Sequence, residues 1–199
     1  MRTFLALILC SCTLLCHAAM AAEKKEQTEV LLNPSRGFPA QGGPAFKSAY
    51  FPAGAGTLVG GRGELALFDG SVGLGVGSYS LASELLADQN GVRREIGLSY
   101  GGVVLDYSFS NRKLFYLNVA SLFGPAQAYS VSRLTGATRD YSTFFIAEPE
   151  LSIMLNTTQS LRLGLGISYR ITAGADNERT LGTGMNGFAG TFTLMYGKI

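Results

Sequence analysis

Charged side chains that could perform catalysis or transport occur two residues apart within otherwise apolar segments. Glu148 and Glu150 have this spacing, and two carboxyl groups on one face of a strand can serve as the acid and base of a hydrolase. Arg62 and Glu64 are spaced in the same way. Leu161–Ile171 alternates throughout, with apolar or aromatic residues at odd positions and Arg, Gly or Ser at even positions. The elements that carry these charges must therefore be identified before a chemistry is assigned.

Alternation with a period of two is typical of a β-strand, because successive side chains point to opposite faces. In Leu161–Ile171 one face is continuously apolar, and the other combines Arg162 and Arg170 with glycine and serine. Small residues beside arginines suit a polar face that is crowded, as in the interior of a narrow membrane β-barrel. We expect the apolar face to meet lipid and the polar face to line a lumen.

The same reasoning places eight charged residues in one lumen. Buried charges are costly unless they are paired, so carboxylates and guanidinium groups sharing a lumen should form a hydrogen-bonded network. Side chains alone can fill an eight-stranded barrel, which disfavours open conduction. We interpret the set as structural; an ion-selective path and acid–base catalysis by Glu148 and Glu150 are the alternatives. The predicted lumen residues are Arg62, Glu64, Glu95, Asp106, Glu148, Glu150, Arg162 and Arg170.

The first residues predict export from the cytoplasm. Met1–Ala21 has one basic residue, an apolar run and the small-x-small sequence Ala19-Met20-Ala21, which is typical of a cleaved secretory signal peptide. All three cysteines and the single histidine lie within this segment. The remaining chain therefore has no means of forming a disulfide, a Ser-His-acid triad or a Cys/His metal site. We expect no metal and no cofactor.

Charge and hydropathy exclude further classes of protein. Removal of Arg2 lowers the formal net charge from +2 to +1, which is too balanced for a nucleic-acid-binding protein. No apolar stretch of 18 residues follows the signal peptide, so any membrane crossing must use strands. The sequence Gly73-x-Gly75-x-Gly77 resembles a phosphate loop, but no helix follows it, so no dinucleotide site is expected.

Turn-forming residues divide the rest of the chain into eight predicted strands. Residues 22–43 are charged or turn-forming and predict a flexible periplasmic leader, followed by a barrel over residues 44–199. Short turns alternate with longer loops, as in outer-membrane barrels whose termini lie in the periplasm. We also expect side-chain phase to change at Gly77-Ser78 and at Gly101-Gly102. The predicted strands are Phe46–Phe51, Thr57–Leu67, Val72–Ala82, Glu95–Phe109, Leu114–Phe123, Ser142–Leu155, Leu161–Thr172 and Gly187–Tyr196.

Two further sets of residues are predicted to lie at the rims of the barrel. Aromatic residues near strand ends can form interfacial girdles; these are Tyr50, Phe51, Tyr107, Phe109, Phe123 and Tyr196. Basic residues in the longer predicted loops can contact the phosphates of lipopolysaccharide; these are Arg93, Arg94, Arg133, Arg139 and Arg179.

Four segments resemble the landmarks of a known group of proteins. Gly42–Lys47, Val59–Gly63, Phe144–Pro149 and Leu163–Arg170 are similar to motifs of small, uncharacterised outer-membrane β-barrel proteins of Gram-negative bacteria, especially the Bacteroidetes type. The resemblance covers most of residues 42–197. It implies a membrane barrel and carries no assigned activity.

The sequence thus predicts an all-β protein with a single antiparallel transmembrane barrel in the outer membrane. We expect a non-enzymatic monomer with a structural or surface-interaction role, whose partners are outer-membrane lipid, lipopolysaccharide and the outer-membrane assembly machinery. A narrow channel or a small-solute-binding barrel is the first alternative. A lipid-modifying enzyme is disfavoured because such barrels rely on histidine. A soluble lipocalin-like carrier is the last alternative, and it would place the apolar face inside.

Overall fold

The structure is a computed structural model. It describes residues 40–68, 70–89, 92–132, 138–174 and 185–197. The predicted signal peptide, residues 1–21, and residues 22–39 of the predicted leader lie outside the described part of the chain.

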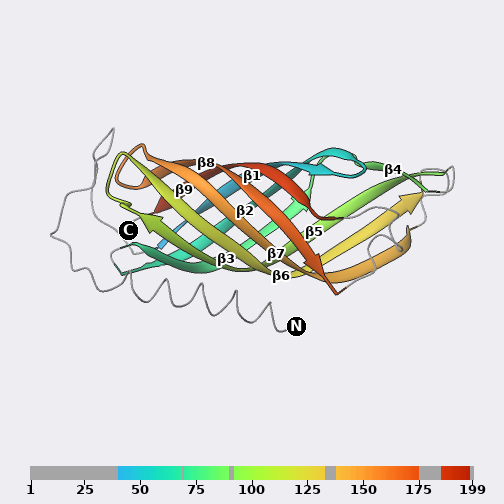
Figure 1. Cartoon of the computed structure of the whole chain (residues 1–199), viewed down its shortest axis with the longest axis horizontal. Coiled ribbons are helices and arrows are strands. Elements are labelled where there is room, and N and C mark those ends of the chain that lie inside the picture. The colour runs from blue at the N-terminus through green and yellow to red at the C-terminus, as the bar shows by residue number, and fades with distance from the viewer. Residues whose placement is uncertain (1–39, 69, 90–91, 133–137, 175–184, 198–199) are drawn as a thin grey trace.

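One antiparallel sheet contains all the strands of the described residues, and it closes into a barrel (Figure 1). Strand β3 pairs with β2 on one side and with β5 on the other, which joins the two edges. Eight strands form the barrel, while the short β4 pairs with β5 alone. The strands are β1 (Ala40–Phe51), β2 (Gly54–Leu67), β3 (Val72–Leu81), β4 (Leu86–Gln89), β5 (Val92–Phe109), β6 (Phe115–Ser132), β7 (Thr138–Asn156), β8 (Leu161–Ala173) and β9 (Gly187–Gly197). The prediction of an all-β, eight-stranded antiparallel barrel is confirmed.

The two ends of the barrel differ. We call the end with the short connections after β2, β5 and β7 the turn end, and the opposite end the loop end. Gln41 pairs with Gly197 at the turn end, so the first and last strands meet there. At the loop end β6 and β7 pair as far as Val131 and Thr138, whereas β7 and β8 pair only to Phe145 and Ala173. Strands β4–β7 therefore project beyond the rest of the barrel (Figure 1).

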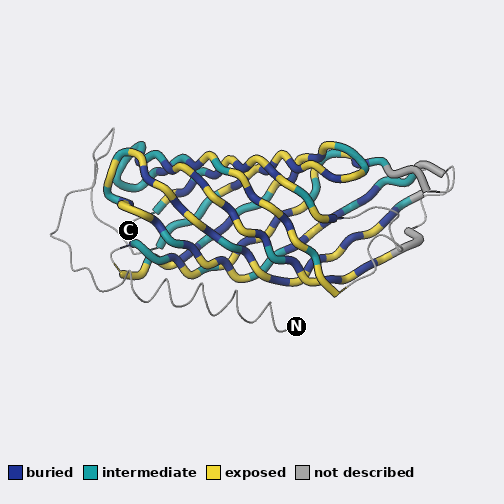
Figure 2. Tube along the Cα trace, in the orientation of Figure 1, coloured by how far each residue is buried: buried dark blue, intermediate teal, exposed yellow. Residues whose placement is uncertain are grey.

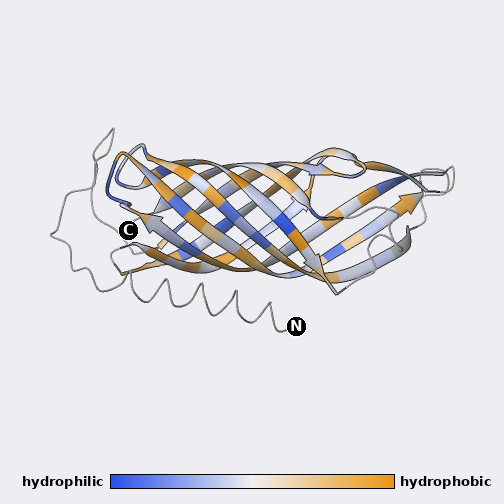
Figure 3. Ribbon diagram, viewed as in Figure 1, coloured by the Kyte–Doolittle hydropathy of each residue, from blue (hydrophilic) through white to orange (hydrophobic). Residues whose placement is uncertain are grey.

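Burial alternates along the strands, as expected for a closed sheet with two different faces (Figure 2). In β8 the side chains of Arg162, Ser168 and Arg170 are buried, whereas Leu165 and Ile167 are exposed on the outside. Figure 3 shows apolar residues interleaved with hydrophilic ones along the strands. None of the described residues forms a helix long and apolar enough to cross a membrane.

Several predicted strand boundaries are wrong because they leave out residues that belong to strands. Strand β1 begins at Ala40, so it includes residues 40–43, which the sequence assigns to the leader. The connection predicted between Ala82 and Glu95 contains β4 and the first residues of β5, and much of the connection predicted between Phe123 and Ser142 belongs to β6 and β7. Polar residues continue a strand wherever a neighbouring strand satisfies the backbone, so composition alone underestimates strand length.

The two predicted phase changes are also wrong. The register is constant from Leu58 paired with Leu81 to Leu67 paired with Val72, and it is also constant between β3 and β5. Apart from Gly102, which is half-buried, the even-numbered residues of β5 remain buried from Ile96 to Ser108. The alternation of apolar and polar residues inverts along β5 because the inward positions are apolar at the loop end and polar towards the turn end.

Prolines interrupt the hydrogen-bond ladder without shifting its register. Between β5 and β6 the pairing is absent at Gly101 and Gly102, opposite Gly124 and Pro125, and then resumes in the same register. Proline has no amide hydrogen to donate. The strands approach closely at this point, since a Cβ on Gly102 would lie 1.9 Å from the carbonyl oxygen of Phe123.

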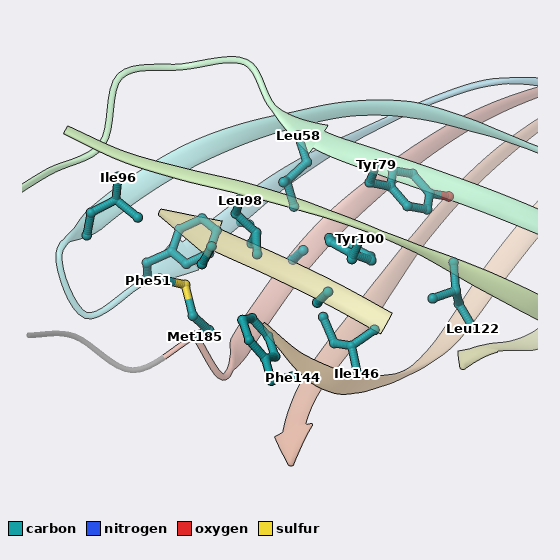
Figure 4. Close-up of a cluster of buried hydrophobic side chains, with 14 of the residues drawn as sticks. Phe51, Leu58, Tyr79, Ile96, Leu98, Tyr100, Leu122, Phe144, Ile146 and Met185 are labelled. Carbon is teal, nitrogen blue, oxygen red and sulfur yellow. The ribbon is translucent and has the colours of Figure 1, made fainter. Parts of the chain in front are cut away.

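Buried apolar side chains gather towards the loop end in a cluster that we call the loop-end core (Figure 4). Its larger members come from six strands and from the segments before β4 and β9. A second, smaller group, Tyr116, Met154 and Met195, lies in the turn-end half. The labelled members of the loop-end core are Phe51, Leu58, Tyr79, Ile96, Leu98, Tyr100, Leu122, Phe144, Ile146 and Met185.

Candidate functional site: the charged lumen

The most completely bonded charge in the lumen is the carboxylate of Glu148, which lies on the inward face of β7. The hydroxyl of Tyr100 donates a hydrogen bond of 2.6 Å to its Oε2 atom. Its Oε1 atom accepts a 2.7 Å bond from the Ser168 hydroxyl and lies 3.2 Å from Lys47 Nζ. Three strands besides β7 thus supply a partner, so this residue connects widely separated parts of the barrel wall.

Glu150 occupies the next inward position of β7. Its Oε2 atom lies 3.4 Å from Lys47 Nζ, and its Oε1 atom lies 3.7 Å from Nη1 of Arg62. The Ser152 hydroxyl donates a hydrogen bond of 2.9 Å to Oε1. Lys47 also lies 4.1 Å from the centre of the Tyr79 ring, a distance suited to a cation–π contact. We call Lys47, Arg62, Glu148 and Glu150 the mid-barrel network.

A separate chain of hydrogen bonds lies towards the turn end. Arg162 donates from Nε to Asn156 Oδ1 at 3.1 Å and from Nη1 to Gln41 Oε1 at 2.7 Å. Gln41 in turn donates to Glu64. The Asn156 amide donates to the backbone carbonyls of Asn111 and Lys113, at 2.8 and 2.6 Å. This chain connects β8, β1 and β2 with the turn between β5 and β6.

Two other predicted lumen residues, Asp106 and Arg170, interact with the charges described above without forming one of the ion pairs. Asp106 is buried, and its carboxylate lies against Gly73, where a Cβ would come within 2.5 Å of Oδ1. Arg170 is fully buried, with its guanidinium carbon 4.6 Å from the centre of the Phe51 ring and 5.7 Å from that of Tyr100. Two aromatic rings therefore lie beside this arginine, and its charge also interacts with the carboxylate of Glu148.

Seven of the eight predicted lumen residues have buried side chains within the barrel: Arg62, Glu64, Asp106, Glu148, Glu150, Arg162 and Arg170. The eighth, Glu95, is wrongly placed by the prediction. It precedes Ile96, which together with Leu98 points into the loop-end core, so alternation puts Glu95 on the outer face. The predicted phase change had assigned the apolar side chains to the outside.

Several residues of this site were missed by the sequence analysis. Lys47 contacts both carboxylates of the mid-barrel network, yet the predicted first strand was too short to reveal its alternation with Phe46 and Tyr50. The phase change predicted at Gly101-Gly102 places Tyr100 on the outer face together with Ile96 and Leu98. Gln41 was placed in the leader. The signal that could have found Lys47 is its position between Ala45 and Ala49, on the small-residue face of β1.

Most of the aromatic residues predicted at the rims lie on the outer surface, but one is buried. Tyr50, Phe109, Phe123 and Tyr196 are exposed on the outside, and Tyr107 packs edge-on against Phe109 with ring centres 4.6 Å apart. Phe51, in contrast, is fully buried beneath Arg170, so its assignment to a girdle is wrong.

The predicted loop arginines lie at the loop end where they are described. Arg93 and Arg94 belong to β5, paired with β4, and Arg139 belongs to β7. The remaining two, Arg133 and Arg179, lie outside the described residues.

Glu148 and Glu150 share a face of β7, as an acid–base pair would, and each carboxylate lies beside Lys47 and accepts a hydrogen bond from a serine hydroxyl. Among the described residues no group of three His, Cys, Asp or Glu side chains is placed to hold a metal ion.

No family model matches the chain, and no curated protein matches it in sequence. Among solved structures it is similar to Neisserial surface protein A, with a TM-score of 0.59 and 12% identity over 80% of this chain and 96% of that one. It is also similar to the N-terminal β-barrel domain of Pseudomonas aeruginosa OprF, with a TM-score of 0.50 and 12% identity over 81% and 98% of the two chains. These similarities show the fold that the chain shares with small outer-membrane barrels. They do not support the narrower Bacteroidetes-type assignment.

Proposed function

We propose that this chain is an integral outer-membrane protein with a structural or surface-interaction role. The observation that carries the proposal is the outward apolar surface of the barrel. Val76, Ile153, Leu165 and Ile167 are each at least 60% exposed, and they come from three different strands. Soluble monomers rarely expose such an extended apolar surface, whereas a bilayer covers it without cost.

The same surface argues against a soluble lipocalin-like carrier, which would direct its apolar side chains inward around a ligand. Here the inward positions of β8 carry Arg162, Ser168 and Arg170, and the outward positions carry leucine and isoleucine. The fold similarity to outer-membrane barrels is consistent with the membrane location that we propose.

We propose that the barrel is closed and has no enzymatic activity. The mid-barrel network and the loop-end core lie in succession along the interior, and both consist of buried side chains. A path for ions would require several of these contacts to separate together.

The proposed interaction surface is the projecting sheet of β4–β7. Tyr129 and Tyr141 lie directly opposite each other on β6 and β7, and both are exposed. Arg93 and Arg94 lie on β5 of the same sheet. Aromatic and basic residues beyond the apolar band suit the sugar and phosphate groups of lipopolysaccharide, which is the partner class that we propose.

Membrane location is tested by expressing the full chain in a Gram-negative host and separating the membranes. We expect the protein in the outer-membrane fraction, with a gel mobility that changes on heating because a folded barrel migrates differently from an unfolded chain. Recovery of a folded protein from the soluble periplasmic fraction would refute the proposal.

Closure, the absence of enzymatic activity and binding need three further measurements. Planar-bilayer recordings should show no discrete conductance, and labelled lipid A or phospholipid should give no product; steady channels or turnover would contradict the closed, non-enzymatic assignment. Lipopolysaccharide binding should weaken in an Arg93→Gln/Arg94→Gln variant and stay unchanged in Lys113→Gln, which removes a charge at the turn end. Equal weakening in both would exclude a specific site at the loop end.

A further inference from the structure

Arg170 is the feature of the lumen that the bonding described above leaves unexplained. Its side chain is completely buried on the inward face of β8, next to the boundary between the mid-barrel network and the loop-end core. The rings of Phe51 and Tyr100 lie near its guanidinium carbon, at 4.6 and 5.7 Å. A cation–π contact engages the flat face of a guanidinium group, whereas its N–H donors lie in the plane of the group.

Those donors have no acceptor in the described part of the chain. Neither Nε nor Nη1 nor Nη2 of Arg170 makes a hydrogen bond there. Buried polar groups nearly always have a partner, and a buried charge without one is especially costly. Glu148 is already engaged by Tyr100, Ser168 and Lys47. The arginine therefore presents a full set of donors to whatever acceptor reaches it.

The carboxylate of Glu148 does not supply the missing acceptor. Glu148 interacts electrostatically with Arg170, yet none of the three guanidinium nitrogens makes a hydrogen bond to any described residue. Because the dielectric constant of a protein interior is low, a buried guanidinium group with free donors attracts a small anion more strongly than it would in water.

We propose that Arg170 is the binding site of a small monovalent inorganic anion such as chloride. The guanidinium edge would donate hydrogen bonds to the anion. The loop-end core, including Phe51 and Met185, would separate it from bulk solvent. This enclosure restricts the ligand to a single small ion, because a phosphate ester or a sugar would have to displace the packed side chains of the core. The inference is independent of the role proposed for the outer surface.

Bromide replaces chloride and is visible by anomalous X-ray scattering, so it serves as the test ion. Crystals of the full-length wild-type protein soaked in sodium bromide should show an anomalous peak at the guanidinium group of Arg170. The thermal midpoint of the detergent-solubilised protein should rise by about 5 °C and saturate as bromide replaces gluconate at constant ionic strength.

Arg170→Met keeps the length of the side chain and removes the donors, so it should abolish the bromide-dependent rise. Lys113→Gln, which removes a positive charge from an exposed turn, should preserve it. A wild-type crystal without a peak at Arg170 would overturn the site, and so would an Arg170→Met protein that keeps the full rise. If Arg170→Met fails to fold, the anomalous map of the wild-type protein alone decides the question.

Discussion

Glu148→Gln provides the sharpest test of the idea that ion pairs inside the lumen stabilise this barrel. The substitution keeps the shape of the side chain and one acceptor oxygen, which can accept from either Tyr100 or Ser168, and the amide nitrogen can donate to the other hydroxyl once that hydroxyl turns. It removes the charge that faces Lys47 at 3.2 Å. With an effective dielectric constant of about 20, two unit charges at that distance attract each other by about 5 kcal/mol. Desolvation of both groups offsets part of this attraction.

The expected loss of unfolding free energy is about 3–5 kcal/mol, the range typical when one member of a buried ion pair is removed. The loss arises because Lys47, whose side chain is 3% exposed, remains buried and keeps one ion pair, the 3.4 Å contact to Glu150, beside the ring of Tyr79. A second substitution, Lys47→Met, removes that remaining charge. The double variant should therefore be more stable than Glu148→Gln alone.

Urea unfolding in phospholipid vesicles would measure these differences. The chain has no tryptophan, so unfolding is followed by far-ultraviolet circular dichroism and by the heat-dependent shift in gel mobility. Lys113→Met, at an exposed turn, is the matched control for the lysine substitution. The reasoning is refuted if Glu148→Gln costs less than about 1 kcal/mol. It is also refuted if the effects of the two single substitutions add within about 0.5 kcal/mol in the double variant.

Three other changes test the structure at separate points. A cysteine at Leu165 should react with a lipid-phase reagent and one at Gly166 should not, since they lie on opposite faces of β8; the reverse labelling would mean that the barrel is inside out. Gly102→Ala should prevent folding, because its Cβ would lie 1.9 Å from a backbone oxygen of β6, whereas Gly190→Ala should fold normally, with nothing within 4 Å; equal yields of folded protein would contradict the close approach. Asn156→Ala should lower stability by about 1–3 kcal/mol, because two backbone carbonyls and a buried arginine lose their partner; an unchanged urea midpoint would show that these bonds do not contribute.

The sequence predicts the architecture well where each face of a strand has one character. In β8, leucines and isoleucines alternate with arginine, glycine and serine, and the structure has the predicted faces. Arg62 and Glu64 of β2 are likewise buried as predicted. Alternation is a local property of the backbone, so it can be read from a single segment. Pairing partners and strand ends depend on neighbouring strands. This explains why β1, β6 and β7 are longer than predicted, and why β4 is not predicted.

The interior positions of β5 show why the rest of the site was not predictable. Ile96 and Leu98 point inward and so does Asp106, because the loop end of the lumen is apolar while its middle is charged. If every apolar residue is assigned to the lipid-facing side, a change of phase must be assumed between these positions, and β5 has none. The same assignment places Tyr100 on the outside, although its ring belongs to the loop-end core and its hydroxyl donates to Glu148. Residues at the boundary between two interior environments contribute to both, so their roles follow from the closed barrel and not from the pattern of any one strand.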